Sequence, residues 1–265
     1  MPASDLHQIA ARLKDANTLL FRKLSLATKG AGYWQSMWAA GGTPAAGAAA
    51  GSVNGRQCTR ATTGAAQYVD PVAGLITQIC DALFSAGQKG RIVIYDRLWD
   101  DSALNASIIT LQAIAPPALP RYADGEGVEL WGETHAAFGA VNTNFTAKYK
   151  NQAGVGAKTA VYPWTHGAPV AGQMFPFPLQ TGDRGVTALE SLQLSVDTGA
   201  AGNLGLVLLK RLCSLAVKAA DSDEIYDFIR TRFRQVQDNA CLAIMVHANA
   251  ATTGDVDVDA NLIQS

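Results

Sequence analysis

The sequence predicts a mainly β protein: a jelly-roll-like antiparallel β-sandwich with an N-terminal helix, a short second helix and a C-terminal helical insert. The clearest signal is in residues 141–150, where apolar or aromatic side chains alternate with polar ones, as in a strand with one buried face. About eight such runs follow one another between turn-rich connections. Of the 265 residues, 48% are hydrophobic and 16% are charged, so the chain can bury a large core.

The first 66 residues are predicted to form a helix and a Gly/Ala-rich arm, ahead of a β-sandwich domain at residues 67–265. Residues 4–27 carry apolar side chains at helical spacing, with Ser4 as a suitable N-cap and Gly30 as a stop. Residues 39–66 are mostly glycine, alanine, threonine and proline, which is typical of a long ordered loop or a flexible arm.

The middle of the chain is predicted to contain the second helix and a long hairpin. Residues 70–87 begin with Asp-Pro and place apolar side chains on one side of a helix that ends at glycine. The extended runs at 128–138 and 141–150 are separated only by Gly139 and Ala140, a connection short enough for a hairpin. We therefore expect these two runs to pair with each other.

Further strands are predicted on both sides of this hairpin, from alternation or from short apolar runs. They comprise residues 91–99, 107–114, 157–162, 192–196, 204–212, 241–246 and 255–259. In the last of them, aspartates alternate with valines, which favours an acidic, solvent-facing edge strand. Residues 221–236 return to helical spacing after a capping-box-like start and form the predicted helical insert.

Composition and sequence signals limit the class of partner and the compartment. The net charge of −1 argues against nucleic acid, because phosphate binding usually requires a basic excess. The polar N-terminus is unlike a signal peptide, and Lys210 and Arg211 interrupt the most apolar run, so neither secretion nor a membrane partner is expected. The four scattered cysteines indicate reduced, mostly buried thiols made in a cytoplasm.

No recognisable chemistry emerges from the candidate residues, so we predict a non-enzymatic protein with no catalytic residue, no metal and no cofactor. Glu133 and His135 share one side of a strand and could supply half of the ligands of a metal site. No second half is recognisable, so a surface Glu/His pair is the better interpretation. The aspartates of residues 255–259 resemble the start of an EF-hand loop without its glycine. Nucleophile elbow, P-loop and dinucleotide motifs are all missing.

The predicted interface residues are Tyr33, Trp34 and Trp38, in a segment framed by glycines. As part of an extended arm, the two tryptophans would insert into a neighbouring surface. The alternative is a loop folded onto its own core, which is the more common fate of large aromatic side chains.

Several patches resemble a group of bacteriophage and prophage proteins encoded among virion structural genes. The patches are RIVIYDRLW (91–99), PRYADGEGVELW (120–131), KYKNQAG (148–154), PVAGQMFPFPLQTGDRGV (169–186) and LQLSVDTGAAGNLGLVLLKRL (192–212), together with the Gly32-Tyr33-Trp34 region. The resemblance implies a virion component assembled in the host cytoplasm. It implies no catalytic or binding residue.

The resulting hypothesis is a virion structural protein that decorates or cements the capsid as a symmetric homo-oligomer. Its partners would be itself and other virion proteins such as the major capsid protein. One alternative is a neck or tail component. A second, from another class, is a carbohydrate-binding module or glycan hydrolase on the same sandwich, which would need exposed aromatics such as Trp131, Tyr149 or Trp164 beside carboxylates.

Overall fold

The computed structural model describes residues 17–24, 31–73, 75–231, 234–249 and 254–264. The fold is mainly β, as predicted, and every strand pairing within these residues is antiparallel. Three sheets are present, of six, four and seven strands. None of the described helices is long and apolar enough to cross a membrane.

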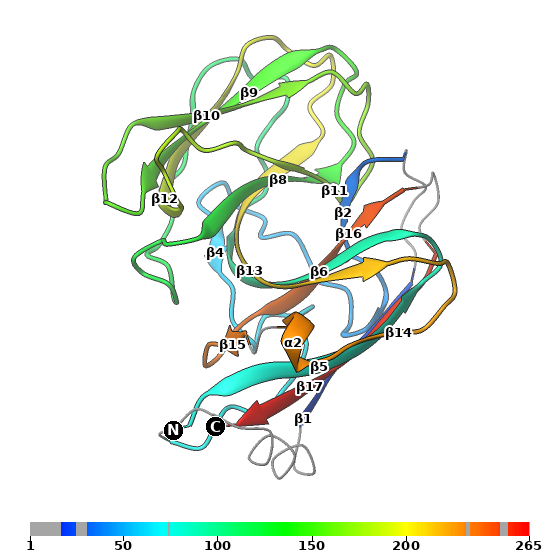
Figure 1. Cartoon of the computed structure of the whole chain (residues 1–265). Helices are drawn as coiled ribbons and strands as arrows, with labels where there is room; N and C mark the ends of the chain where they lie inside the picture. Colours follow the sequence, from blue (N-terminus) through cyan, green and yellow to red (C-terminus); the bar gives the residue numbers. More distant parts are fainter. Residues whose placement is uncertain (1–16, 25–30, 74, 232–233, 250–253, 265) are drawn as a thin grey trace.

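Six strands of the largest sheet close into a barrel, because β13 pairs with β8 on one side and with β6 on the other. In Figure 1 these strands surround the centre of the molecule. A short seventh strand, β4 (Arg56–Gln57), pairs with β6 outside the ring. In ring order the barrel strands are β13 (Asn203–Val217), β8 (Val128–Ala136), β11 (Gln173–Pro176), β2 (Trp34–Ser36), β16 (Leu242–Ala248) and β6 (Gly90–Asp100).

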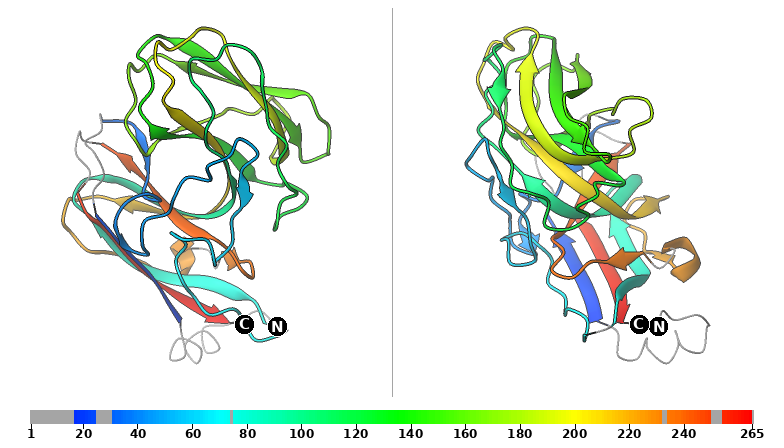
Figure 2. Two further views of the ribbon diagram at one scale, coloured as in Figure 1. Left: turned by 180° about the vertical axis from the view of Figure 1, so that it is seen from behind. Right: turned by 90° about the vertical axis from the view of Figure 1, so that its left-hand side faces the viewer.

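A separate sheet flanks the barrel on each of two sides (Figures 1 and 2). The four-stranded sheet contains β10 (Lys158–Trp164), β9 (Thr143–Asn151), β12 (Val186–Leu194) and β7 (Gln112–Ala113). The six-stranded sheet contains β14 (Glu224–Tyr226), β5 (Thr77–Ala86), β17 (Val256–Gln264), β1 (Asn17–Lys23), β3 (Gly42–Thr43) and β15 (Gln235–Val236). The barrel wall thus takes the place of the second layer that a single sandwich would supply.

Three apolar clusters hold these layers together. The barrel interior contains Trp131, Tyr95, Met174 and their neighbours, drawn from all six ring strands. A second cluster lies between the six-stranded sheet and the barrel strands β6, β13 and β16. A third lies between the four-stranded sheet and β8, β11 and β13. Because β13 contributes to all three clusters, its 15 residues connect the whole molecule.

The predicted helices are not supported. Within residues 4–27, the described part is the strand β1 and Leu24, while residues 4–16 and 25–27 lie outside the described residues. The second helix is wrong, because most of its predicted range is the ten-residue strand β5. The predicted insert consists of β14, one helical turn, α2 (Phe228–Thr231), and β15. Both short strands pair with β5, so this segment extends a sheet.

Two expectations about strand pairing are also wrong. β8 belongs to the barrel and β9 to the four-stranded sheet, so the predicted central hairpin does not form. β9 instead pairs with β10 and β12. The predicted acidic edge strand, β17, pairs with β5 on one side and β1 on the other and therefore lies inside its sheet. Its aspartates face outward, and Arg22 on β1 pairs with two of them.

Candidate functional site

The three predicted interface residues lie on and beside barrel strand β2. Trp34 is half-buried in the strand, and Tyr33 is half-buried just before it. Trp38 is only 2% exposed. Its indole lies within this chain's own core, as in the alternative weighed from sequence. A role for Tyr33 and Trp34 in contacts between molecules stays a prediction.

Residues 39–66, predicted as part of an arm, cover one end of the barrel. The Trp38 indole nitrogen donates to the Ala48 carbonyl at 3.2 Å, and a Cβ on Gly47 would lie 2.2 Å from the indole ring. Only glycine allows the backbone to cross Trp38 so closely. Ala66 forms an isolated bridge with Leu242 in the barrel. The boundary predicted at residue 66 stays a prediction.

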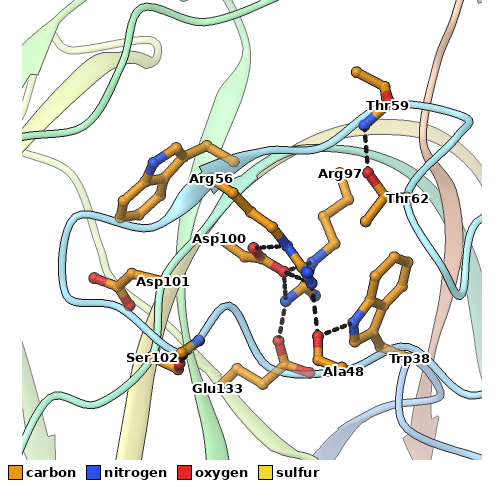
Figure 3. A network of polar contacts seen from close by, with 12 residues as sticks. Trp38, Ala48, Arg56, Thr59, Thr62, Arg97, Asp100, Asp101, Ser102 and Glu133 are labelled. Carbon is orange, nitrogen blue, oxygen red and sulfur yellow. Dashed lines mark hydrogen bonds and ion pairs between the residues drawn. The ribbon is translucent and has the colours of Figure 1, made fainter.

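Beneath this segment lies a buried network of charged side chains centred on Arg97 (Figure 3). The Arg97 guanidinium pairs with Glu133 at 2.6 Å and with Asp100 at 2.9 Å, and all three residues are at most 2% exposed. Arg56 from β4 pairs with the other Asp100 oxygen at 2.9 Å. Burial alone would raise the pKa of Glu133, but Arg97, His135 and a hydrogen bond with Ser36 hold it below its ordinary value. The network closes this end of the barrel with paired charges.

The opposite end of the interior has a second charged group, and this one reaches solvent. Glu129 and Glu133 lie two residues to either side of Trp131 on β8. Glu129 Oε2 accepts hydrogen bonds from Trp131 Nε1 at 2.8 Å and from the Tyr95 hydroxyl at 3.3 Å. Its other oxygen pairs with Arg211 Nε at 3.0 Å, and the two charged side chains are 30% and 40% exposed.

A cavity of about 580 Å³ opens beside this second group. Its walls combine aromatic rings, other apolar side chains and charges, from β2, β8, β11, β13 and the connection after β11. Its lining includes Trp34, Glu129, Trp131, Phe177, Arg184 and Arg211. Trp34 also borders a smaller cavity of about 390 Å³ with Arg91 and His247. The centre of the Trp34 ring lies 5.4 Å from that of Trp131 and 4.8 Å from that of His247.

Most other residues singled out from sequence lie elsewhere. Glu133 is buried in the Arg97 network, so the interpretation of a surface Glu133–His135 pair is wrong. Tyr149 and Trp164 are completely buried in the core between the four-stranded sheet and the barrel, so neither offers an exposed platform for a sugar. Trp131 is 3% exposed but borders the cavity. Among the described residues, no three His, Cys, Asp or Glu side chains converge as metal ligands would.

Sequence reasoning missed the partners of the charges buried along strand β6. The signal was present in the apolar strand 91–99, which contains Asp96 and Arg97. A charge inside such a run needs a buried partner. Arg97 finds Glu133, 36 positions away, and Asp96 finds Arg121, whose Nη2 is 2.6 Å from the carboxylate. Separations of this length leave no spacing rule that identifies the partner in advance.

Comparison with known proteins identifies no family. No protein-family model matches the chain, and no curated protein does. Among solved structures, it aligns with a VP2 subviral particle of infectious bursal disease virus at 8% identity and a TM-score of 0.20, covering 94% of this chain and 80% of the other. It also aligns with T=1 particles derived from the same virus, at 9% identity and a TM-score of 0.20, covering 94% of this chain and 78% of the other. These scores are too low to indicate a shared fold.

Proposed function

We propose that this protein is a non-enzymatic structural subunit of a bacteriophage virion, which decorates or cements the capsid as a symmetric oligomer. The resemblance of its sequence patches to phage virion proteins supports the class. The observation that carries the proposal is the presence of exposed apolar side chains on the six-stranded sheet and on connections of the four-stranded sheet, at opposite ends of the molecule.

The first surface is a row of exposed apolar side chains across the outer face of the six-stranded sheet. Ile225 on β14 lies opposite Leu83 on β5, and Leu83 and Leu20 lie on either side of Asp259. Ile225 is 67% exposed, and nearby Ile229 on α2 is 71% exposed. Single exposed apolar residues are common on protein surfaces. Several exposed apolar side chains in register on one sheet face, here on either side of the Arg22–Asp259 ion pair, are instead typical of a surface that another molecule covers.

The second surface lies at the edge of the four-stranded sheet, on the connections that flank β7, β9 and β12. Gln193 holds this edge together by donating to the Ile109 carbonyl, and Val141 donates to the Thr198 carbonyl at 3.1 Å. The exposed side chains are Ile108, Ile109, Leu111, Val141 and Val196. Two apolar surfaces at opposite ends suit a subunit that touches a second copy through one and the particle through the other.

The test measures mass by multi-angle light scattering, first on the purified chain and then after mixing with particles assembled without it. We expect one defined oligomer that binds the particles at a fixed stoichiometry. The double variant Leu83→Ser/Ile225→Ser should lose the oligomer or the particle binding while keeping its far-UV circular dichroism spectrum. The matched control is Val155→Ser, which changes a 51% exposed valine between β9 and β10, at the opposite end of β9 from Val141 and Val196.

Two other results would redirect the proposal. Retention on isolated necks or tails, without binding to capsids, would move the protein to those structures. A monodisperse monomer that binds no virion part would contradict the proposal.

A further inference from the structure

The cavity beside Glu129 is built differently from the apolar surfaces proposed for assembly. Its volume of about 580 Å³ lies within the range of about 300–1,000 Å³ that is typical of small-ligand pockets. Phe177, Leu130, Leu179 and Trp34 are among its apolar lining residues. Its charged lining residues are Glu129, Arg211, Asp183 and Arg184, of which Glu129 and Arg211 form an ion pair. An aromatic wall with a few convergent polar groups is a pattern for recognition of a small molecule.

The Glu129–Arg211 pair is held in a fixed orientation. The carboxylate accepts hydrogen bonds from Trp131 Nε1 at 2.8 Å and from the Tyr95 hydroxyl at 3.3 Å, and it pairs with Arg211 Nε at 3.0 Å. The guanidinium also lies over the Tyr95 ring, 5.7 Å from its centre. An ion pair this exposed adds only about 0–1 kcal/mol to stability. The geometry instead presents an acceptor and a planar donor side by side, already oriented before a ligand arrives.

These groups select the chemistry of the ligand. An anion that binds Arg211 would be repelled by the neighbouring Glu129 carboxylate. A cation that binds Glu129 would be repelled by the neighbouring Arg211 guanidinium. A wholly apolar ligand would remove water from both charges without replacing their hydrogen bonds. A sugar ring satisfies both requirements, because its hydroxyls donate to a carboxylate and accept from a guanidinium while its C–H face packs on an indole.

We propose that this cavity binds a neutral saccharide of one or two rings, with Trp34 against the apolar face of a ring and Glu129 and Arg211 hydrogen-bonded to its hydroxyls. Trp131 is a positioning residue, since its indole nitrogen holds Glu129. This proposal is independent of the assembly role. The protein could be a structural subunit without a sugar site, or it could bind sugars without being part of a virion, and the two tests distinguish these results.

The test is a tryptophan fluorescence titration of the full chain with maltose, cellobiose, lactose and N,N′-diacetylchitobiose in turn. Of the five tryptophans, only Trp34 and Trp131 border the cavity, and Trp38, Trp99 and Trp164 are at most 2% exposed in the core. We expect a saturable change with at least one disaccharide. Its apparent Kd should rise at least tenfold in Arg211→Met and in Glu129→Gln.

The matched control is Arg22→Met, which removes an arginine of similar exposure from an ion pair on the six-stranded sheet and should leave the Kd unchanged. Trp34→Leu should abolish saturation, and its circular dichroism melt checks that the barrel is intact. Absence of saturation with all four disaccharides would overturn the proposal. Equal affinity in wild type, Arg211→Met and Glu129→Gln would also overturn it, because binding would then occur elsewhere.

Discussion

Lys23 is a buried cation whose described partners are carbonyl groups. It is 2% exposed on β1, and its ammonium donates to the carbonyls of Ala40 at 3.2 Å and Pro44 at 2.7 Å. Burial lowers the pKa of this side chain from 10.5 to about 8. The neutral amine is therefore favoured in the folded protein relative to the unfolded chain.

The lowered pKa of Lys23 predicts a rise in stability with pH. Between about pH 8 and pH 10.5, the unfolded chain keeps a proton that the folded protein has released, so the free energy of unfolding increases as the pH rises. The gain is at most about 3.5 kcal/mol, because the pKa differs by about 2.5 units and each unit corresponds to about 1.4 kcal/mol.

The measurement is urea unfolding of wild type and Lys23→Met across this pH interval. Burial raises the pKa of Cys80 and of Cys213 to about 11, which lowers stability as the pH rises towards that value. Both proteins share the cysteine contribution, so the difference between them isolates Lys23. A difference that does not change with pH would show that Lys23 stays charged when folded.

At the scale of elements, the sequence identified strands well where one face is buried without interruption. β6, β8, β9 and β13 all lie where alternation or an apolar run predicted them. The helix predicted over residues 70–87 is wrong for a physical reason that lies in β5. Its pairing with β17 has an irregularity between Asn261 and Leu262, opposite Cys80. Ile79 and Cys80 are consequently both buried, and the alternation that marks a strand is broken.

Pairing partners were harder to predict than strands. The alternation in residues 141–150 fixes which side chains face inward but carries no information about the neighbouring strand. Residues 137–142 instead cross from the barrel to the four-stranded sheet. Gly139 packs so closely on this path that a Cβ there would lie 1.7 Å from the Thr198 carbonyl oxygen. The charged groups that flank Trp131 depend on the same distant pairings, so the candidate site could not be assembled from sequence.

The segment over Trp38 allows a test of whether it is a fixed cover of the barrel. In Gly47→Ala, the new methyl group would overlap the indole, so either the segment or Trp38 must move. We expect a loss of about 1–3 kcal/mol in unfolding free energy, the usual cost of overpacking. Trp38 should also become more accessible to acrylamide.

The matched control for Gly47→Ala is Gly41→Ala in the same segment. A Cβ at Gly41 would meet only Leu24, at an ordinary contact distance of 3.7 Å. Equal stability of the two variants would mean that residues 39–66 move freely over the barrel end.

The whole molecule is organised so that both flanking sheets depend on one barrel. Strand β13 supplies Leu206 to the core shared with the four-stranded sheet, Val207 to the barrel interior and Leu215 to the core shared with the six-stranded sheet. No layer can lose its packing without disturbing a strand that another layer uses. We therefore expect one cooperative unfolding transition, although the molecule has separate clusters.

The variant Phe145→Ala tests this coupling from one end of the molecule to the other. Phe145 is completely buried against Trp164 and Phe175, and its truncation should cost about 3–5 kcal/mol. Of the four buried cysteines, Cys80 lies on β5 and Cys213 in the core under the six-stranded sheet, so thiol labelling measured at these two positions reports opening of that sheet. If the molecule unfolds as one unit, thiol labelling and circular dichroism should give the same loss of free energy. Labelling that proceeds at the wild-type rate while circular dichroism shows early melting would mean that the four-stranded sheet unfolds separately, and that the barrel does not couple the two ends.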